Sequence, residues 1–388
     1  MQKASRTTAI LFVLAFIASA CGGSSDVANA ASDVVAEATT TTAAETTTTT
    51  EAPAADEAEE AEVAEETTTT TEEPPQTGPV YPLTGEFIDE GAVDDADHAA
   101  VVVKISNNDE AARSALDGLD EADLIYEERI ENEATRFAAV YHSELPEQVG
   151  SIRSGRTSDI QIVANLNRPV FGFSGANDGV HDQLREAEVD GILLRVSADF
   201  GDPQLSRISD FPSPNNLVAD VSRLIDVAPE DSEPPEPVFD YSNNVSDLGR
   251  RSPGVSVDAS SVAQYVWSED DGGYLRFHDG VPLITQDGVH IAPVNVIVLT
   301  TTYVPSEIDA LSVDAVTIGE GRVEVYSNGD RVDGTWTREF ARDAFTLTTA
   351  DGDTIGLAPG QTWISLAPSQ TSTELTDSQA EELAENAG

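Results

Sequence analysis

The chain has 388 residues, of which 71 are Asp or Glu and only 20 are Lys or Arg, giving a formal net charge of −51. This acidity excludes nucleic acid as a partner, because phosphate recognition needs a basic surface, and it disfavours binding to anionic lipid head groups. The length allows two average domains with flanking segments. Cys21 is the only cysteine, so no disulfide can form within the chain.

The first 21 residues have the pattern of an export signal. Lys3 and Arg6 precede the apolar run AILFVLAFIA at 9–18, which is too short to span a bilayer. The run leads into ASAC, which resembles a bacterial lipobox with Ala18 where Leu is more common. We expect lipidation of Cys21 and a membrane anchor on the extracytoplasmic side. An ordinary secretory leader that contains a cysteine is the alternative.

Residues 22–78 are predicted to be a disordered acidic tether. Runs of Thr and Glu dominate this segment, and it contains neither Lys nor Arg. Its few apolar residues cannot bury enough surface to offset the entropy cost of ordering. The tether would hold the following domain away from the membrane.

Residues 79–228 are predicted to form an α/β domain with a mixed sheet. Strands are expected at 98–107, 122–130, 134–143, 168–175 and 191–197, and helices at 157–167 and 177–188. The short turn between the second and third strands predicts an antiparallel hairpin. The later alternation of strands and helices predicts parallel pairing through crossover helices.

The stretch GSIRSGR at 150–156 gathers two arginines and two serines in this acidic chain. If strands 135–142 and 169–174 are parallel neighbours, the loops that leave them share one sheet edge and each leads into a helix N-terminus, which favours an anion. The residues expected to line this anion site are Arg153, Ser154, Arg156, Ser174 and Asn177. Ion pairs of the two arginines with Asp159 or Glu147 are the alternative.

Arg136 joins this group only if the loop at 144–155 folds back along the sheet, since it lies at the beginning of its strand. Candidate acid/base residues are Glu127 and Glu131 on the hairpin, for which cross-strand salt bridges are the alternative. His181 is a further candidate, as the base for Ser154 or Ser174. The five histidines show no metal-binding spacing, and no metal or cofactor is predicted.

Residues 229–238 are rich in Pro and Glu and are predicted to be a linker. Short alternating runs predict a mostly antiparallel, sandwich-like β domain over 239–368, followed by a loose acidic tail at 369–388. Trp267, Trp336 and Trp363 belong either to the core of this domain or to a carbohydrate-binding groove.

The chain resembles the YerB-like family of bacterial lipoproteins, which carry two consecutive domains of unknown function. The matching stretches are YPLTG, VVKISN, ADLIYE, EATRFAAVYHS, VGSIRSGR, YLRFHDG, NVIVL, DGTWTR and PGQTWISL, which cover most of 80–367. Two stretches depart from the family pattern. ARSALDGL replaces an Arg-Pro-Gln-like stretch, and SPNNL has Asn215 where the family has His. The resemblance implies an envelope lipoprotein without an established activity.

The preferred hypothesis is a non-catalytic, membrane-anchored envelope lipoprotein that binds an anionic ligand, such as a group of a wall polymer, at the Arg/Ser loop. One alternative is a wall-acting hydrolase or lyase that uses Glu127, Glu131 or His181. The other is a tethered scaffold that contacts envelope proteins.

Overall fold

The computed structural model describes residues 78–89, 91–259, 261–308 and 311–387. The predicted leader, Cys21 and the tether up to residue 77 lie outside the described residues. Among the helices that are described, none is long and apolar enough to cross a membrane.

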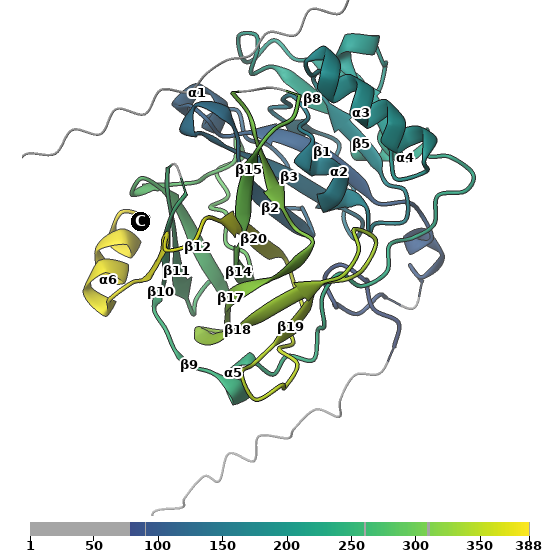
Figure 1. Ribbon diagram of the computed structural model, residues 1–388. Coiled ribbons are helices and arrows are strands. Elements are labelled where there is room, and N and C mark those ends of the chain that lie inside the picture. Colours follow the sequence, from purple (N-terminus) through teal and green to yellow (C-terminus); the bar gives the residue numbers. More distant parts are fainter. Residues whose placement is uncertain (1–77, 90, 260, 309–310, 388) are drawn as a thin grey trace, which may run out of the picture. The chain divides into compact units, whose positions relative to one another are not determined.

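A sheet of eleven strands forms the centre of the body (Figure 1). Ten strands follow one another across it, and an eleventh, β9 (Arg250–Arg251), pairs with β18. The ten, in spatial order, are β19 (Thr346–Thr348), β18 (Asp330–Arg338), β17 (Gly319–Ser327), β14 (Asn295–Thr300), β20 (Thr362–Ala367), β2 (Leu124–Arg129), β3 (Thr135–Tyr141), β1 (Val101–Ser106), β5 (Val170–Phe173) and β6 (Leu194–Ser197).

The predicted hairpin is confirmed, because β2 and β3 pair antiparallel and are joined by a short 3₁₀ turn, η2 (Glu131–Glu133). The predicted parallel pairing through crossover helices is found in β1, β5 and β6. The expectation that β3 and β5 are parallel neighbours is wrong. Strand β1 lies between them and runs antiparallel to β3 and parallel to β5, so β3 ends at the edge opposite to the end of β5.

One face of this sheet is covered by α2 (Ser158–Val163) and α3 (Asp178–Val189). Their apolar side chains pack on β1, β3 and β5 through residues such as Leu184 and Phe171. Helix α3 begins where predicted, with Asn177 as its N-cap, whereas α2 is shorter than the predicted helix at 157–167.

The other face packs against two smaller sheets and α4 (Val221–Ile225). One has three strands, β4 (Val149–Gly150), β8 (Leu217–Ala219) and β7 (Leu205–Arg207). The other is antiparallel and has five, β13 (Val281–Pro282), β12 (Gly273–His278), β11 (Val262–Ser268), β10 (Gly254–Asp258) and β21 (Ser372–Glu374). Trp363 of β20 is fully buried between the layers, 4.9 Å from the Phe137 ring and 5.9 Å from the Tyr265 ring.

The predicted sandwich therefore appears as the five-stranded sheet stacked on the C-terminal part of the large sheet. Trp336 and Trp363 belong to the core, being 2% and 0% exposed. The remaining elements are α1 (Glu110–Arg113), α5 (Val245–Leu248), α6 (Asp377–Glu385), β15 (Thr302–Pro305) paired with β16 (Val313–Val316), η1 (Asp94–Ala96) and η3 (Ala198–Phe200).

The N-terminal α/β region and the C-terminal β region share the large sheet. Strand β20 comes late in the chain, yet it pairs in parallel with both β14 and β2. Val238, at the end of the predicted linker, is buried and its carbonyl accepts the N–H of Phe345. The segment 229–238 therefore connects two parts of one folded body.

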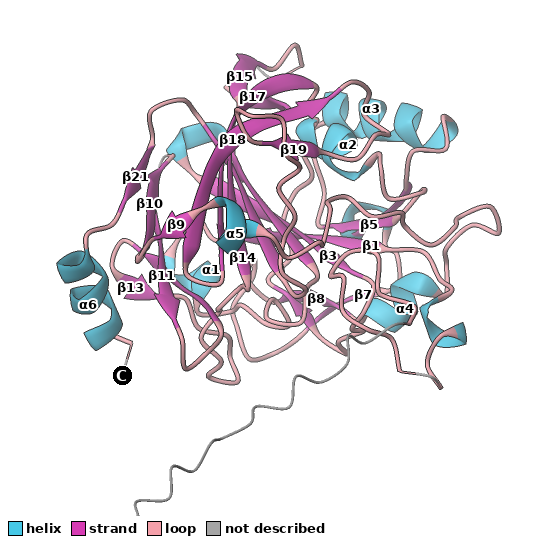
Figure 2. Ribbon diagram, turned by 90° about the horizontal axis from the view of Figure 1, so that it is seen from below, coloured by secondary structure: helices cyan, strands magenta, loops and turns pink. Residues whose placement is uncertain are grey.

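The expected loose tail at 369–388 instead contains β21 and α6. Strand β21 extends the five-stranded sheet by pairing with β10. Helix α6 begins with a capping box between Thr376 and Gln379, an arrangement that satisfies two free N–H groups. Ala380 and Leu375 bury against Val266 and Phe277, and Figure 2 shows α6 as the outermost element on this side.

Adjacent carboxylates on β2 are buried on opposite faces of the sheet, each beside a cation. Glu127 accepts from Arg276 at 3.1 Å on the face of the five-stranded sheet. Glu128 pairs with Lys104 on the helix-covered face, and Lys104 also lies 2.6 Å from Asp159 of α2. All three members of the Lys104 cluster have fully buried side chains. The cluster therefore joins β1, β2 and α2.

Lys104→Met should destabilise the fold by about 3–5 kcal/mol, because it leaves two buried carboxylates without their cation. Urea unfolding at neutral pH measures this loss. The triple variant Lys104→Met, Glu128→Gln, Asp159→Asn should recover much of it, since no uncompensated charge remains. A loss below 1 kcal/mol in the single variant would contradict the role given to this cluster.

Candidate functional site

The GSIRSGR loop, residues 150–156, folds back along the end of β1. Its backbone accepts the N–H of Ser106 at Ser151 and donates the N–H of Arg153 to the carbonyl of Lys104. It then meets the loop after β5, because the Ser174 N–H donates to Arg153 and the Gly155 N–H donates to Gly175. The loop therefore folds back along the sheet, which is the condition under which Arg136 is expected to join the group.

The loop and its neighbours surround a pocket of about 400 Å³. Four of the predicted residues line it, namely Ser154, Arg156, Ser174 and Asn177. The predicted convergence of the two loops is thus present, although the strand pairing from which it was argued is wrong. Convergence arises because the chain after β3 returns to the C-terminal ends of β1 and β5 before α2 begins.

Arg156 is tied to a carboxylate in the pocket wall. Its Nε donates to Glu131 Oε2 at 2.9 Å, and its Nη2 donates to Oε1 of the same group. Burial by itself would raise the pKa of Glu131, but the hydrogen bonds and charge of Arg156 outweigh it and hold this pKa below the usual value. The ion-pair alternative is therefore realised for Arg156, with Glu131 as partner in place of Asp159 or Glu147.

Arg136 and Arg153 have no such tie. Within the described residues, neither guanidinium has a carboxylate at ion-pair distance. Arg136 is 7% exposed and donates from Nη1 to the Ser154 carbonyl at 3.1 Å, while its Nε is buried without a partner. Burial and the positive charge of Arg156 lower the pKa of Arg136 to about 10. Arg153 donates to the side-chain oxygen of Asn215.

The region around the loop therefore gathers four cations in an acidic protein, and two of them, Arg136 and Arg153, have no carboxylate at ion-pair distance among the described residues. Its cations are Lys104, Arg136, Arg153 and Arg156, and its carboxylates are Glu128, Glu131 and Asp159. An anion near the loop would interact favourably with guanidinium groups that now have only neutral partners.

Asp199 brings a further carboxylate to the pocket, beside His181. The Nε2 atom of His181 lies 3.1 Å from Asp199 Oδ2 and 3.1 Å from the Ala176 nitrogen. A neutral imidazole cannot donate to Asp199 and accept from the Ala176 N–H through the same atom. Gly175 leaves room for this carboxylate, since a Cβ atom there would approach Asp199 Oδ2 to 2.2 Å.

The arrangement does not assemble a serine nucleophile. Among the described contacts of His181, neither the Ser154 nor the Ser174 hydroxyl is a hydrogen-bond partner. Glu127 and Glu131 also have separate surroundings. Glu127 accepts from Thr135, Arg276 and Trp363 on the opposite face of the sheet, so the two carboxylates do not form a shared acid/base site.

Sequence reasoning missed Lys104 and Asp199 as parts of this region. Lys104 lies in a run of apolar strand residues, VVVKIS, and a lysine within a buried strand is itself a signal for a buried ion pair. No comparable signal marked Asp199, because its position depends on the turn η3 after β6.

Comparison with known proteins gives two family matches. Residues 83–233 match the family described as "Protein of unknown function (DUF3048) N-terminal domain". Residues 255–364 match the family described as "Protein of unknown function (DUF3048) C-terminal domain". A relative from Bacillus subtilis (strain 168), named "Putative lipoprotein YerB", is 26% identical over 298 residues, which are 74% of this chain and 85% of the relative.

The crystal structure of YerB protein from Bacillus subtilis has the same fold. It superposes with a TM-score of 0.65 at 21% sequence identity, covering 77% of this chain and 100% of the solved chain. The GSIRSGR loop, α3 and the pocket residues up to Asp199 all fall within the first matched domain, 83–233.

Arg156→Met should lower the free energy of unfolding at pH 7 by about 1–2 kcal/mol, because it removes a partly exposed bidentate pair. Glu131 has a lowered pKa in the fold, so its stabilising contribution is present above the unfolded pKa and is lost as pH falls through the folded one. The difference between the variant and the parent should therefore shrink as pH falls below about 4.

Arg195→Met is a matched control, since the Arg195–Glu188 pair has side chains 13% and 26% exposed, against 12% and 26% for Arg156–Glu131. Denaturant unfolding between pH 3 and pH 7 measures both variants. A penalty for Arg156→Met that is independent of pH would show that the pair with Glu131 is not what stabilises the loop.

Proposed function

The chain belongs to the YerB-like family, with its two consecutive DUF3048 domains, and from this premise we propose that it is a lipid-anchored, extracytoplasmic lipoprotein that binds an anionic ligand at the GSIRSGR loop. The name of the Bacillus subtilis relative and the lipobox-like ASAC motif support the anchor. The ligand is a small anion or an anionic group of a wall polymer.

One observation carries the binding proposal. Beneath the loop, Arg136 is a buried guanidinium without a carboxylate partner among the described residues, and Arg153 in the loop has only the amide of Asn215 as a side-chain partner. A buried charge costs free energy unless it is paired. An anion in the pocket would lie next to Arg156, Ser154 and Ser174, which line it. Arg136 does not line the pocket, but its guanidinium donates to the Ser154 carbonyl and would add its charge from beneath the loop.

The proposed function is non-catalytic. Attack by a serine needs a base within hydrogen-bond reach of the hydroxyl, and His181 instead contacts Asp199 and the Ala176 N–H. A hydrolase or lyase is the competing proposal, through Asp199, which lines the pocket, and His181, which contacts Asp199. No contact among the described residues favours the scaffold alternative.

Cys21→Ala should abolish the membrane anchor. Cells that produce the parent protein are expected to incorporate labelled palmitate into it and to retain it in the membrane fraction, because a diacylated cysteine gives stable anchoring. The variant should lose the label and appear in the soluble extracellular fraction. Retention of the label in the variant would contradict lipidation at Cys21.

Anion binding should raise the melting temperature of the full chain. Phosphate, sulfate, citrate and soluble wall fragments are the probes, and a ligand at a hundredfold its Kd stabilises by about 2.7 kcal/mol. The rise should disappear in the double variant Arg153→Gln, Arg156→Gln. It should persist in Arg322→Gln, which removes an arginine from β17, on the other side of the sheet's centre.

The measured quantity is the change on adding the probe, so a lower melting temperature of a variant alone does not decide the question. A rise that is equal in the double variant and the parent would place the anion elsewhere. If none of the probes raised the melting temperature of the parent, the binding proposal would fail.

A further inference from the structure

A second pocket, of about 450 Å³, lies between α1 and the β12–β13 hairpin. One wall comes from Glu110, Arg113 and Ser114 in the N-terminal matched domain, and the other from His278 and residues 281–284 in the C-terminal one. Its volume is within the range of small-molecule sites. None of its residues belongs to the GSIRSGR loop or the pocket beside it.

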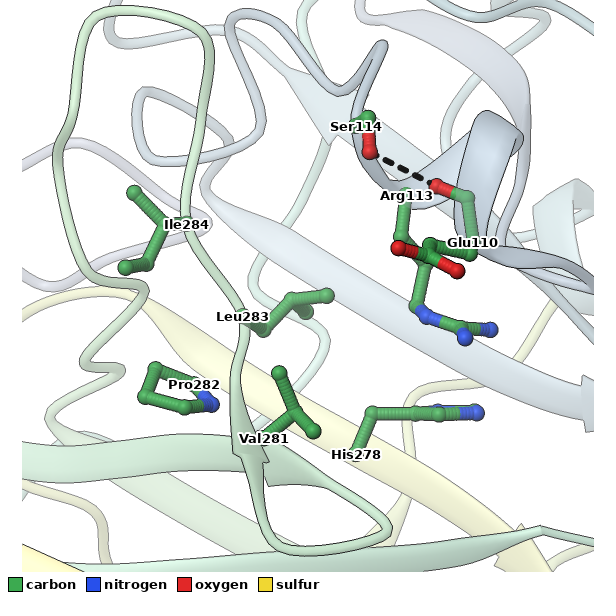
Figure 3. Close-up of a pocket in the computed structure, with 8 residues that line it drawn as sticks. All are labelled: Glu110, Arg113, Ser114, His278, Val281, Pro282, Leu283 and Ile284. Carbon is green, nitrogen blue, oxygen red and sulfur yellow. Dashed lines mark hydrogen bonds between the residues drawn. The ribbon is translucent and has the colours of Figure 1, made fainter. Parts of the chain in front are cut away.

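The polar side of this pocket has an imidazole nitrogen without a hydrogen-bond partner and an arginine without a carboxylate partner among the described residues. His278 is 6% exposed and its Nδ1 is buried without a hydrogen-bond partner among the described residues, while its Nε2 is 3.5 Å from Asp279 Oδ2. Arg113 donates from Nη1 to the Asn107 carbonyl at 2.9 Å and has no carboxylate at ion-pair distance in the described part of the chain. Figure 3 shows its guanidinium and the His278 imidazole projecting to the same side.

A second cation lies behind His278. Arg276, two residues earlier on the same face of β12, is fully buried, and only its Nη2 reaches a carboxylate, that of Glu127. Its Nε and Nη1 atoms are buried without partners. Burial, followed by the positive charges of Arg276 and Arg113, lowers the pKa of His278. The imidazole therefore experiences a positive potential that an anion would reduce.

Apart from His278, the wall that comes from the C-terminal matched domain is apolar. Val281, Pro282, Leu283 and Ile284 form it, and Val281 and Ile284 are 63% and 41% exposed. Exposed aliphatic side chains beside unpartnered buried donors fit a ligand with both kinds of surface, since such sites combine an apolar lining with a few oriented polar groups.

We infer that this pocket binds a small carboxylate that carries an aliphatic chain. The carboxylate would accept from the Arg113 guanidinium and, when the ring is protonated, from Nδ1 of His278, and the aliphatic chain would cover Val281 and Ile284. Arg113 lies in the ARSALDGL stretch and His278 in YLRFHDG, so the ligand would bridge the two matched domains. Glu110, at the same rim, and Asp279, beside His278, oppose the carboxylate and limit its affinity.

Octanoate is the probe, added to the full-length protein. Octanamide, which lacks the charge, and acetate, which lacks the aliphatic chain, are the comparison compounds. Binding is followed through the His278 imidazole resonances by NMR. Octanoate should bind more tightly than either comparison compound and should raise the pKa of His278 by about one unit, because a bound anion favours the protonated ring.

Arg113→Gln should weaken octanoate about tenfold, the loss expected for one charge-assisted hydrogen bond. Glu110→Gln should strengthen it, which a general loss of folding would not do. Arg185→Gln, an exposed arginine on α3, should leave it unchanged. Equal affinities for octanoate and octanamide, unchanged binding in Arg113→Gln, or no binding of octanoate would each overturn the inference.

Discussion

The buried pairing of Lys104 with Glu128 and Asp159 is the interaction on which the arrangement of the site depends. Strand geometry places Glu127 and Glu128 on opposite faces of β2, so each face of the central sheet must supply a cation at the same level. Lys104 does so on the helix-covered face and Arg276 on the other. An unpaired carboxylate in either position would cost several kcal/mol.

This pairing also positions the GSIRSGR loop. Asp159 accepts the Arg156 N–H at 2.7 Å while it contacts Lys104, and the Lys104 carbonyl accepts the Arg153 N–H. The two arginines are therefore fixed by the backbone at both ends of the short segment between them. Arg156 pairs with Glu131, whereas Arg136 donates to the Ser154 carbonyl and Arg153 to Asn215. The placement of these arginines is a consequence of how the core charges are arranged.

The parts of the fold set by local pattern could be predicted. The β2–β3 hairpin, the capped helix α3 and the β-rich C-terminal region follow from alternation, turn residues and the Asn177 cap. The neighbour of β5 could not be predicted, because β1 precedes it by about sixty residues and strand order depends on packing across the whole sheet. The insertion of β20 beside β2 is a pairing of the same long-range kind.

In the site, too, local features could be predicted from the sequence and long-range contacts could not. Local spacing identified Ser154, Arg156, Ser174 and Asn177, which line one pocket. It could not identify Glu131 as the partner of Arg156, because that contact requires the loop to fold back along β1. The partner of Arg153 is Asn215, at the position where family resemblance leads one to expect His, and only the tertiary contact reveals that this departure touches the loop.

The most direct test of anion binding at the loop is an anomalous difference map from crystals of the full chain soaked in selenate. The account predicts a selenium peak in the pocket, within hydrogen-bond distance of Arg156 and of the Ser154 or Ser174 hydroxyl. Peaks only at other surface positions, with this pocket free of selenate, would contradict it.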